Sequence, residues 1–214
     1  MSDNKVILAK YQKQYAELRF ERGDLFKLIS EKYHPTGVLY PGCSIHITPA
    51  FYFPHVVFVD KDRATLEFFS NHEVVLDFVM RNRQYRRKPY IHFIPQDFTK
   101  PLPVPENQFD LVLSLFTGDV SRACKQYLKT GGLLLTNNHQ NDAVEAAQKT
   151  ELTLIASVQF RRGRYQLIEN NPDRSIKIKS QKGTTKNYLR QTSSGVEYIE
   201  NEIYYVFKKN RPRQ

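Results

Sequence analysis

Short apolar runs alternate with helix-compatible segments through the middle of the chain, and this alternation limits the folds that it can adopt. Each run is too short for a helix and too uniformly apolar for a strand with one face in water. Strands that helices cover on both faces have this composition. Five such runs occur: Gly37–Tyr40, His55–Asp60, Tyr90–Ile94, Phe109–Leu115 and Gly132–Thr136.

The segments between these runs have helical patterns. They are Asp62–Phe69, Val74–Arg87, Asp119–Leu128 and Asp142–Lys149. A chain that repeats strand and helix in this order forms a sheet of mostly parallel strands with helices on both faces. The sequence therefore predicts a doubly wound α/β fold.

The first 36 residues do not follow the alternation. Apolar residues at positions 7, 8, 11, 15 and 18 form a helical stripe. Gly23 and Asp24 interrupt it, a second helix begins at Leu25, and the segment His34–Gly37 ends that helix. We therefore divide the chain into a helical N-terminal segment, 1–36, and an α/β domain, 37–214.

The last quarter of the chain lacks clear helices. Leu152–Phe160 and Glu202–Phe207 have strand composition, and Arg164–Ile168 is a candidate for a further strand. Because no helix separates these stretches, we expect them to pair antiparallel at the sheet edge. The polar and basic stretch 170–195 is expected to be an insertion, either a hairpin or a functional loop.

Three of the expected strands end in residues suited to bind a ligand. In doubly wound sheets, ligands bind outside the carboxyl ends of the strands. The first strand is followed by Gly42, which permits a tight turn. The second ends at Asp60, whose carboxylate suits the two hydroxyls of a ribose, and the third leads to Gln96-Asp97-Phe98, which suits a heteroaromatic base.

These strand ends resemble those of the class I S-adenosylmethionine-dependent methyltransferases. The matching segments are Val38–Cys43, Val57–Asp60, Gln96–Phe98, Phe109–Ser114 and Tyr127–Leu135. The resemblance implies a seven-stranded, mostly parallel, Rossmann-like sheet and S-adenosylmethionine as cofactor. It also implies that eight residues bind this cofactor: Tyr40, Gly42, Ser44, Asp60, Lys61, Asp97, Phe98 and Ser114.

The glycine-rich first motif departs from the family pattern. The family has an acid where this chain has Tyr40, and glycines where it has Ser44 and His46. The Cβ atoms of Ser44 and His46 would intrude on the cofactor unless the loop takes another path. Two functions therefore stay open: a methyltransferase of unspecified acceptor, or a catalytically silent methyltransferase-like fold that acts as a binding module, for nucleic acid among other partners.

The sequence does not identify a catalytic residue. Ser114-Leu115-Phe116-Thr117 stands where many amino-methylating relatives have an Asn-Pro-Pro-Tyr type of motif. Methyl transfer to a basic nucleophile needs alignment more than acid–base chemistry, so this difference does not exclude activity. His139, just past the fifth strand, is a candidate substrate contact. A dehydrogenase is disfavoured because no Gly-x-Gly-x-x-Gly follows the first strand.

The charge distribution favours a polyanionic partner or a solvated basic surface. The chain has 32 Lys and Arg against 22 Asp and Glu, a net charge of +10. Residues 158–214 hold 13 of the basic and 5 of the acidic residues, a local excess of +8. Two segments, Arg81–Lys88 and Lys177–Arg190, mix cations with tyrosine, which suits nucleic acid. The acceptor is therefore expected to be a small molecule or a nucleic acid.

Composition excludes other classes of protein. No apolar run approaches the roughly 18 residues of a membrane span, so a transmembrane protein is excluded. The N-terminus has no secretory pattern, and 2 cysteines are too few for a disulfide scaffold, so we expect a cytoplasmic protein. The 6 histidines have no metal-ligand spacing, so no metal site is expected.

Overall fold

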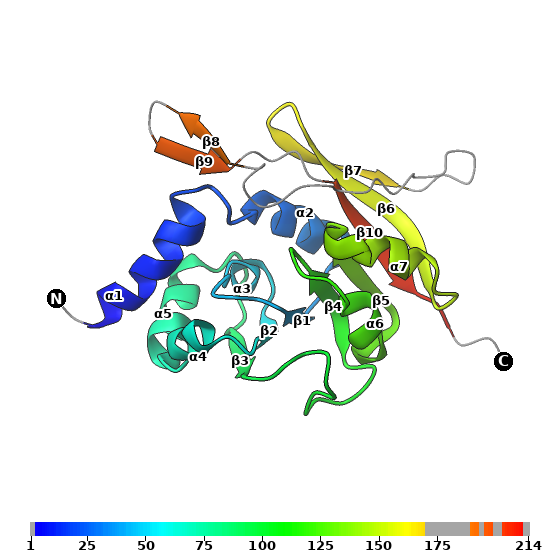
Figure 1. Ribbon diagram of the computed structural model, residues 1–214, viewed down its shortest axis with the longest axis horizontal. Coiled ribbons are helices and arrows are strands. Elements are labelled where there is room, and N and C mark those ends of the chain that lie inside the picture. The colour runs from blue at the N-terminus through cyan, green and yellow to red at the C-terminus, as the bar shows by residue number, and fades with distance from the viewer. Residues whose placement is uncertain (1–2, 170–188, 193–194, 199–202, 212–214) are drawn as a thin grey trace.

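The computed structural model describes residues 3–169, 189–192, 195–198 and 203–211. Eight strands form one sheet in the order β3-β2-β1-β4-β5-β10-β6-β7 (Figure 1). Their bounds are β1 Gly37–Pro41, β2 His55–Val59, β3 Tyr90–Ile94, β4 Phe109–Ser114, β5 Leu128–Thr136, β6 Leu152–Arg161, β7 Arg164–Glu169 and β10 Ile203–Lys209. Two further strands, β8 Leu189–Thr192 and β9 Gly195–Tyr198, form a separate hairpin.

The sheet is mixed, with eight strands rather than the seven mostly parallel strands expected from the sequence. Strands β1 to β5 pair in parallel. β10 is antiparallel to both β5 and β6, and β7 is antiparallel to β6. The expected antiparallel pairing at the end of the chain is confirmed. The extra strand is β7, which a two-residue turn joins to β6, so it adds to the sheet without a crossover helix.

Helices cover both faces of the sheet, and most of them lie close to the expected segments. They are α1 Asp3–Tyr11, α2 Gly23–Tyr33, α3 Pro49–Tyr52, α4 Arg63–Phe69, α5 His72–Asn82, α6 Val120–Ala123 and α7 Asp142–Ala147. A π-helical turn, Gln12–Ala16, follows α1, and single 3₁₀ turns occupy Lys125–Tyr127 and His139–Asn141. The segment Asp119–Leu128, expected to be one helix, divides into α6 and a 3₁₀ turn.

Alternate residues of the central strands lie in two separate hydrophobic cores. Tyr40 and Phe58 point to the core that contains residues of α1, α2 and α5. Leu39 and Val57 point to the core that contains residues of α6 and α7. This period of two follows from the strand geometry and yields three layers, helix on sheet on helix.

The described residues include no helix with both the length and the hydrophobicity needed to cross a bilayer. Most of the expected insertion, 170–188 and 193–194, lies outside the described residues. The same holds for most of the basic segment Lys177–Arg190, of which only Leu189 and Arg190 are described, in β8. The division of the chain at residue 36 stays a prediction.

Candidate functional site

The carboxyl ends of β1 and β2 are joined by the Asp60 carboxylate. Its Oδ2 accepts a hydrogen bond from the Ser44 backbone N–H at 2.8 Å, and its Oδ1 accepts one from Asp62 N–H at 3.0 Å. Ser44 is exposed and has a φ of 48°, in the left-handed region. Asp60 therefore holds the loop that follows β1 in place, while its own side chain is only partly buried.

The ends of β2 and β3 are joined by an ion pair. Lys61 Nζ lies 2.9 Å from Asp97 Oδ2. The other carboxylate oxygen accepts from the Thr99 backbone N–H and hydroxyl at 3.0 and 2.7 Å. The hydrogen bond from Lys61 and those from Thr99 hold the pKa of Asp97 well below its usual range, so this carboxylate is ionised. Phe98, beside it, is half-buried against the core under α6 and α7.

Gly42, in the turn after β1, faces the loop after β4. Its φ is 63°, a conformation that glycine adopts without strain. A Cβ placed on Gly42 would lie 2.9 Å from Thr117 Oγ1 and 3.0 Å from Thr117 Cβ. The space left by the missing side chain is therefore filled by Thr117.

Tyr40 and His46 form a buried pair beneath this loop. The Tyr40 hydroxyl lies 3.0 Å from His46 Nδ1, and His46 Nε2 lies 3.1 Å from the Glu21 carbonyl oxygen. Burial, with a smaller effect of the nearby Arg22 guanidinium, lowers the pKa of His46 to about 3. His46 is thus neutral, accepting from Tyr40 and donating to Glu21. Burial also raises the pKa of Tyr40.

The two residues that stand where the family has glycines, Ser44 and His46, lie in the loop after β1 and differ in exposure. His46 is 2% exposed, and its ring stacks on Tyr15 with centroids 4.5 Å apart. His46 turns into the core and Ser44 turns outward. The N-terminal segment supplies the surface that receives His46.

Ser114, at the end of β4, is fully buried and donates to the Thr117 carbonyl at 3.4 Å. Tyr40 is likewise 3% exposed. The structure therefore brings five of the eight predicted residues together at the strand ends and puts Phe98 beside them, whereas the side chains of Tyr40 and Ser114 lie inside the fold. Cofactor contacts by any of the eight stay predictions. The five are Gly42, Ser44, Asp60, Lys61 and Asp97.

Asn137 is a site residue that the sequence did not reveal. It is fully buried at the carboxyl end of β5, and its Oδ1 accepts the Phe116 backbone N–H at 3.1 Å. Its buried Nδ2 has no hydrogen-bond partner among the residues that the structure describes. Phe116 has a φ of 58°. Such strain in a non-glycine residue is often found at functional sites, and only the fold, which brings β4 beside β5, could connect these two residues.

Arg22 brings the N-terminal segment to the same place. Its guanidinium carbon lies 3.6 Å from the ring centroid of Phe20 and 4.3 Å from that of Phe116. Its Nε donates to the Tyr204 hydroxyl at 2.7 Å. Arg22 is 2% exposed. No periodicity or motif marks this arginine in the sequence, because two of its partners, Tyr204 and Phe116, come from β10 and from the loop after β4.

His139, the candidate substrate contact, is half-buried with its ring centroid 6.1 Å from that of Phe116. It lies at the expected edge of the sheet, and its contact with a substrate stays a prediction. In the part of the chain that the structure describes, no group of three or more His, Cys, Asp or Glu side chains has the arrangement of a metal site.

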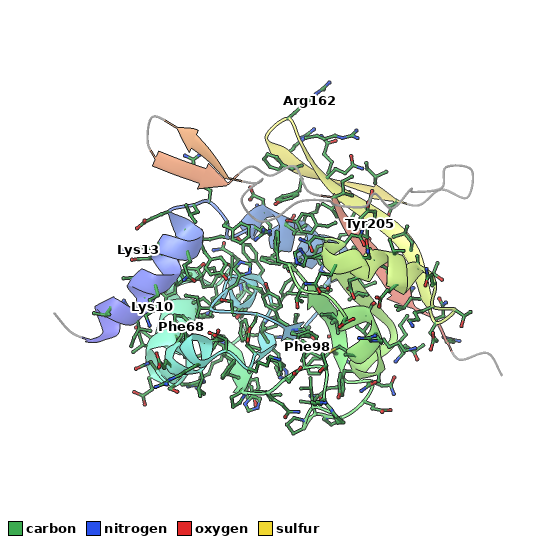
Figure 2. All side chains as sticks on the ribbon, in the orientation of Figure 1. Lys10, Lys13, Phe68, Phe98, Arg162 and Tyr205 are labelled. Carbon is green, nitrogen blue, oxygen red and sulfur yellow. The ribbon has the colours of Figure 1, made fainter. Side chains whose placement is uncertain are left out.

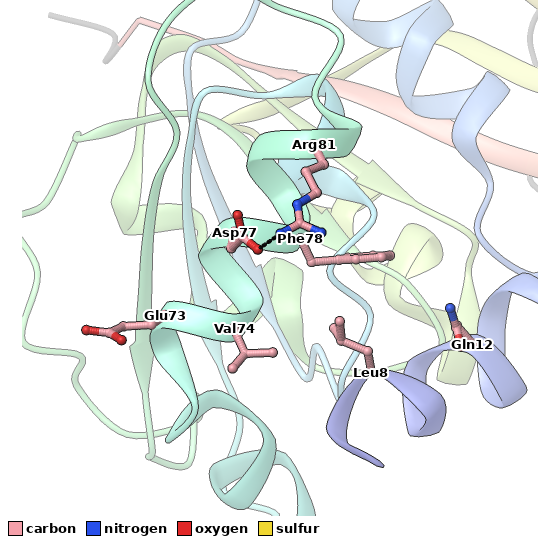
Figure 3. A pocket seen from close by; sticks show the side chains of 7 residues that line it. All are labelled: Leu8, Gln12, Glu73, Val74, Asp77, Phe78 and Arg81. Atoms are coloured by element: carbon pink, nitrogen blue, oxygen red, sulfur yellow. Dashed lines mark hydrogen bonds and ion pairs between the residues drawn. The ribbon is translucent and has the colours of Figure 1, made fainter. Parts of the chain in front are cut away.

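A separate groove of about 720 Å³ lies between α1 and α5 (Figure 3). Leu8, Val74 and Phe78 give it an apolar lining, and Asp77 and Arg81 form an ion pair beside them. None of the predicted cofactor residues lines this groove. It is therefore distinct from the strand-end site.

Solved structures of methyltransferases superpose on this fold. A possible histamine N-methyltransferase from Thermotoga maritima, described as SAM-dependent, superposes with a TM-score of 0.53 at 11% identity, covering 95% of this chain and 96% of that one. The N-methyltransferase NodS from Bradyrhizobium japonicum gives a TM-score of 0.50 at 12% identity, covering 91% and 97%. No protein-family model and no curated protein sequence matches the chain.

The chain has the fold of the class I S-adenosylmethionine-dependent methyltransferases. The strand-end site of this methyltransferase fold retains hydrogen-bond acceptor capacity. Each Asp60 oxygen accepts one backbone N–H and retains capacity for a ribose hydroxyl, and Asp97 Oδ2 retains capacity beyond Lys61. At Gly42, by contrast, Thr117 fills the space beside the turn.

Proposed function

We propose that the protein binds S-adenosylmethionine at the carboxyl ends of β1, β2 and β3 and is a methyltransferase. The observation that carries the proposal is the linked set of strand ends. Ser44 N–H donates to Asp60, and Lys61 pairs with Asp97, so three strands present ordered polar groups at one edge of the sheet. The acceptor is a small molecule or a nucleic acid.

Each residue has a role that follows from its position. The Asp60 oxygens accept the ribose hydroxyls, and Asp97 Oδ2 accepts the amino group of the adenine. Phe98 provides an apolar face for the base. The bound cofactor supplies an electrophilic methyl group. The chain's own contribution is to fix the acceptor in line with it and to exclude water, which can account for much of the rate without a general base.

A second candidate is a silent methyltransferase fold that serves as a binding module. Two observations favour it. Thr117 fills the space at Gly42, and the Tyr40 hydroxyl is engaged by His46 where the family has an acid. Both reduce what the first motif offers to the methionine end of the cofactor. In this alternative, the chain retains an adenosine site or none at all.

A thermal unfolding scan with S-adenosylmethionine, S-adenosylhomocysteine and adenosine separates these functions. A ligand at a hundredfold excess over its dissociation constant stabilises the folded state by about 2.7 kcal/mol. We expect a clear rise in the midpoint with the two cofactor forms. A rise with adenosine alone supports the silent alternative. No rise with any of the three contradicts both the cofactor site and the function built on it.

Methyltransferase activity is tested by the transfer of a labelled methyl group from S-adenosylmethionine to candidate acceptors, namely small amines and RNA.

We also propose a cytoplasmic location. Both cysteines, Cys43 and Cys124, are buried free thiols, which suits a reducing compartment. Fractionation of cells that produce the full chain tests that location.

A further inference from the structure

The hairpin formed by β6 and β7 ends in three arginines within four residues. Arg161 is the last residue of β6, Arg164 is the first of β7, and Arg162 with Gly163 forms the turn between them. All four residues are exposed. A Cβ added to Gly163 would meet no described atom within 4 Å, so the space beside this turn residue is open. Figure 2 shows Arg162 extending away from the molecule at this tip.

The arginines are placed at some cost to the hairpin. Arg161 and Arg164 are directly opposite each other across the two strands, where like charges destabilise the pair. Arg162 has a φ of 52° and Gly163 a φ of 76°. A turn with two positive φ values favours the sequence Asn-Gly. Most other residues with a Cβ, such as Arg162, destabilise such a turn by roughly 1–2 kcal/mol. Neither cross-strand pairing nor turn preference therefore explains why arginine occupies positions 161, 162 and 164.

No ion pair within the described chain offsets the repulsion between these arginines. No acidic side chain among the described residues forms an ion pair with any of the three arginines. The stem beneath them is firmly packed. Phe160 and Tyr165 contact each other edge to face with centroids 5.1 Å apart, and Tyr165 contacts Tyr204 of β10. Within the described chain, the tip therefore presents three guanidinium groups without an acidic partner, on a stem held by aromatic contacts.

We propose that the tip of the β6–β7 hairpin binds the phosphate backbone of a nucleic acid. Guanidinium groups bind phosphate oxygens through paired hydrogen bonds. A two-stranded ribbon fits the major groove of a B-form duplex. An anionic membrane suits the tip less well, because residues 161–164 include no apolar side chain that could enter the bilayer. The net charge of +10 favours the same class of partner.

The direction of β6 connects this tip to the rest of the molecule. β10 is antiparallel to β5, and β6 is antiparallel to β10, so β6 runs in the same direction as β5. Arg161 therefore lies at the edge of the sheet that holds Asp60 and Asn137. The binding claim does not rest on the proposed function, because it needs no cofactor.

The test measures binding of fluorescently labelled RNA and DNA, single-stranded and duplex, over a range of salt concentrations. The variant R161Q/R162Q/R164Q removes the three charges at the tip. The control K10Q/K13Q/K27Q removes three charges from exposed positions of α1, the π-helical turn and α2. We expect the tip variant to bind at least about tenfold more weakly and to lose about 2–3 units of salt slope. We expect the control to lose much less.

A third variant separates binding from folding. Arg162→Asn provides the turn sequence that the hairpin prefers, so it should raise the unfolding midpoint while it weakens binding. The proposal would be overturned if both triple variants lost the same affinity for nucleic acid. It would also be overturned if Arg162→Asn bound nucleic acid as tightly as the unsubstituted chain. Equal affinity of the parent for polyglutamate or for vesicles with anionic lipid would overturn it as well, since either result would show a preference for any polyanion.

Discussion

The Asp60 carboxylate lies 2.8 Å from the backbone nitrogen of Ser44, so the end of β2 holds the loop that follows β1. The second oxygen of the same carboxylate binds the Asp62 N–H. One side chain thus positions two loops at the edge of the sheet where ligands bind in doubly wound folds. The position of Asp60 matters for structure as well as for the proposed cofactor contact.

Substitution of Asp60 by Ala should lower the free energy of unfolding by about 1–2 kcal/mol, because two backbone N–H groups lose a charged acceptor. Denaturant unfolding measures this change. Asp62→Asn is the matched control, since Asn retains the acceptor for the Thr65 N–H at the start of α4. A loss in Asp62→Asn as large as that in Asp60→Ala would contradict the role given to Asp60.

Thr117→Ala should open the space beside Gly42. If the methionine half of the cofactor lies there, the variant binds S-adenosylmethionine more tightly, whereas its affinity for adenosine does not change. Competition binding with S-adenosylmethionine and adenosine measures the ratio of the two affinities.

The opposite substitution, Gly42→Ala, should destabilise the fold by roughly 1–2 kcal/mol, because Gly42 has a positive φ that a residue with a Cβ adopts only with strain. Thr117→Ala should then recover the part of the loss that comes from the close contact, and a strictly additive double variant would contradict that contact.

The buried His46 predicts a pH-dependent stability. Its pKa is about 3 in the folded state, below the ordinary value of 6.5. Between these values the unfolded chain binds a proton that the folded chain does not, so the stability is fully present above pH 6.5 and falls as the pH decreases toward 3. The slope is up to about 1.4 kcal/mol per pH unit.

Denaturant unfolding at pH 7, 6 and 5 measures this effect. His46→Gln cannot titrate and should show a smaller decrease over that range than the parent chain. His92→Gln, at an exposed position of β3, controls for the loss of one imidazole. Identical pH dependence in the parent and His46→Gln would show that His46 is not the group responsible.

The elements with local signals were predicted from the sequence, and the contacts between distant segments were not. The apolar runs of β1 to β5 and the acid at the end of β2 are local features, and both lie where expected. Position 40 shows the limit. The strand was identified correctly, but the period of two turns the Tyr40 side chain toward the N-terminal helices, and its partner His46 could be recognised only in the folded chain.

Asn137 shows the same limit at the site. Its amide oxygen holds Phe116 N–H from a neighbouring strand end, and that pairing depends on the strand order. Asn137→Ala should leave the Phe116 N–H without its acceptor and so speed hydrogen exchange at that amide. It should also lower the free energy of unfolding by about 1–3 kcal/mol. Unchanged protection of that amide would show that Asn137 does not hold the loop.

Calorimetric titration of the full chain with S-adenosylmethionine and S-adenosylhomocysteine tests the central claim most directly. We expect saturable binding at one site per chain. Asp60→Asn should bind at least about tenfold more weakly, because a charged acceptor to the ribose is lost. Two results would contradict a cofactor site at these strand ends. One is that the unsubstituted chain gives no saturable binding heat at millimolar ligand. The other is that Asp60→Asn binds the ligand as tightly as the unsubstituted chain.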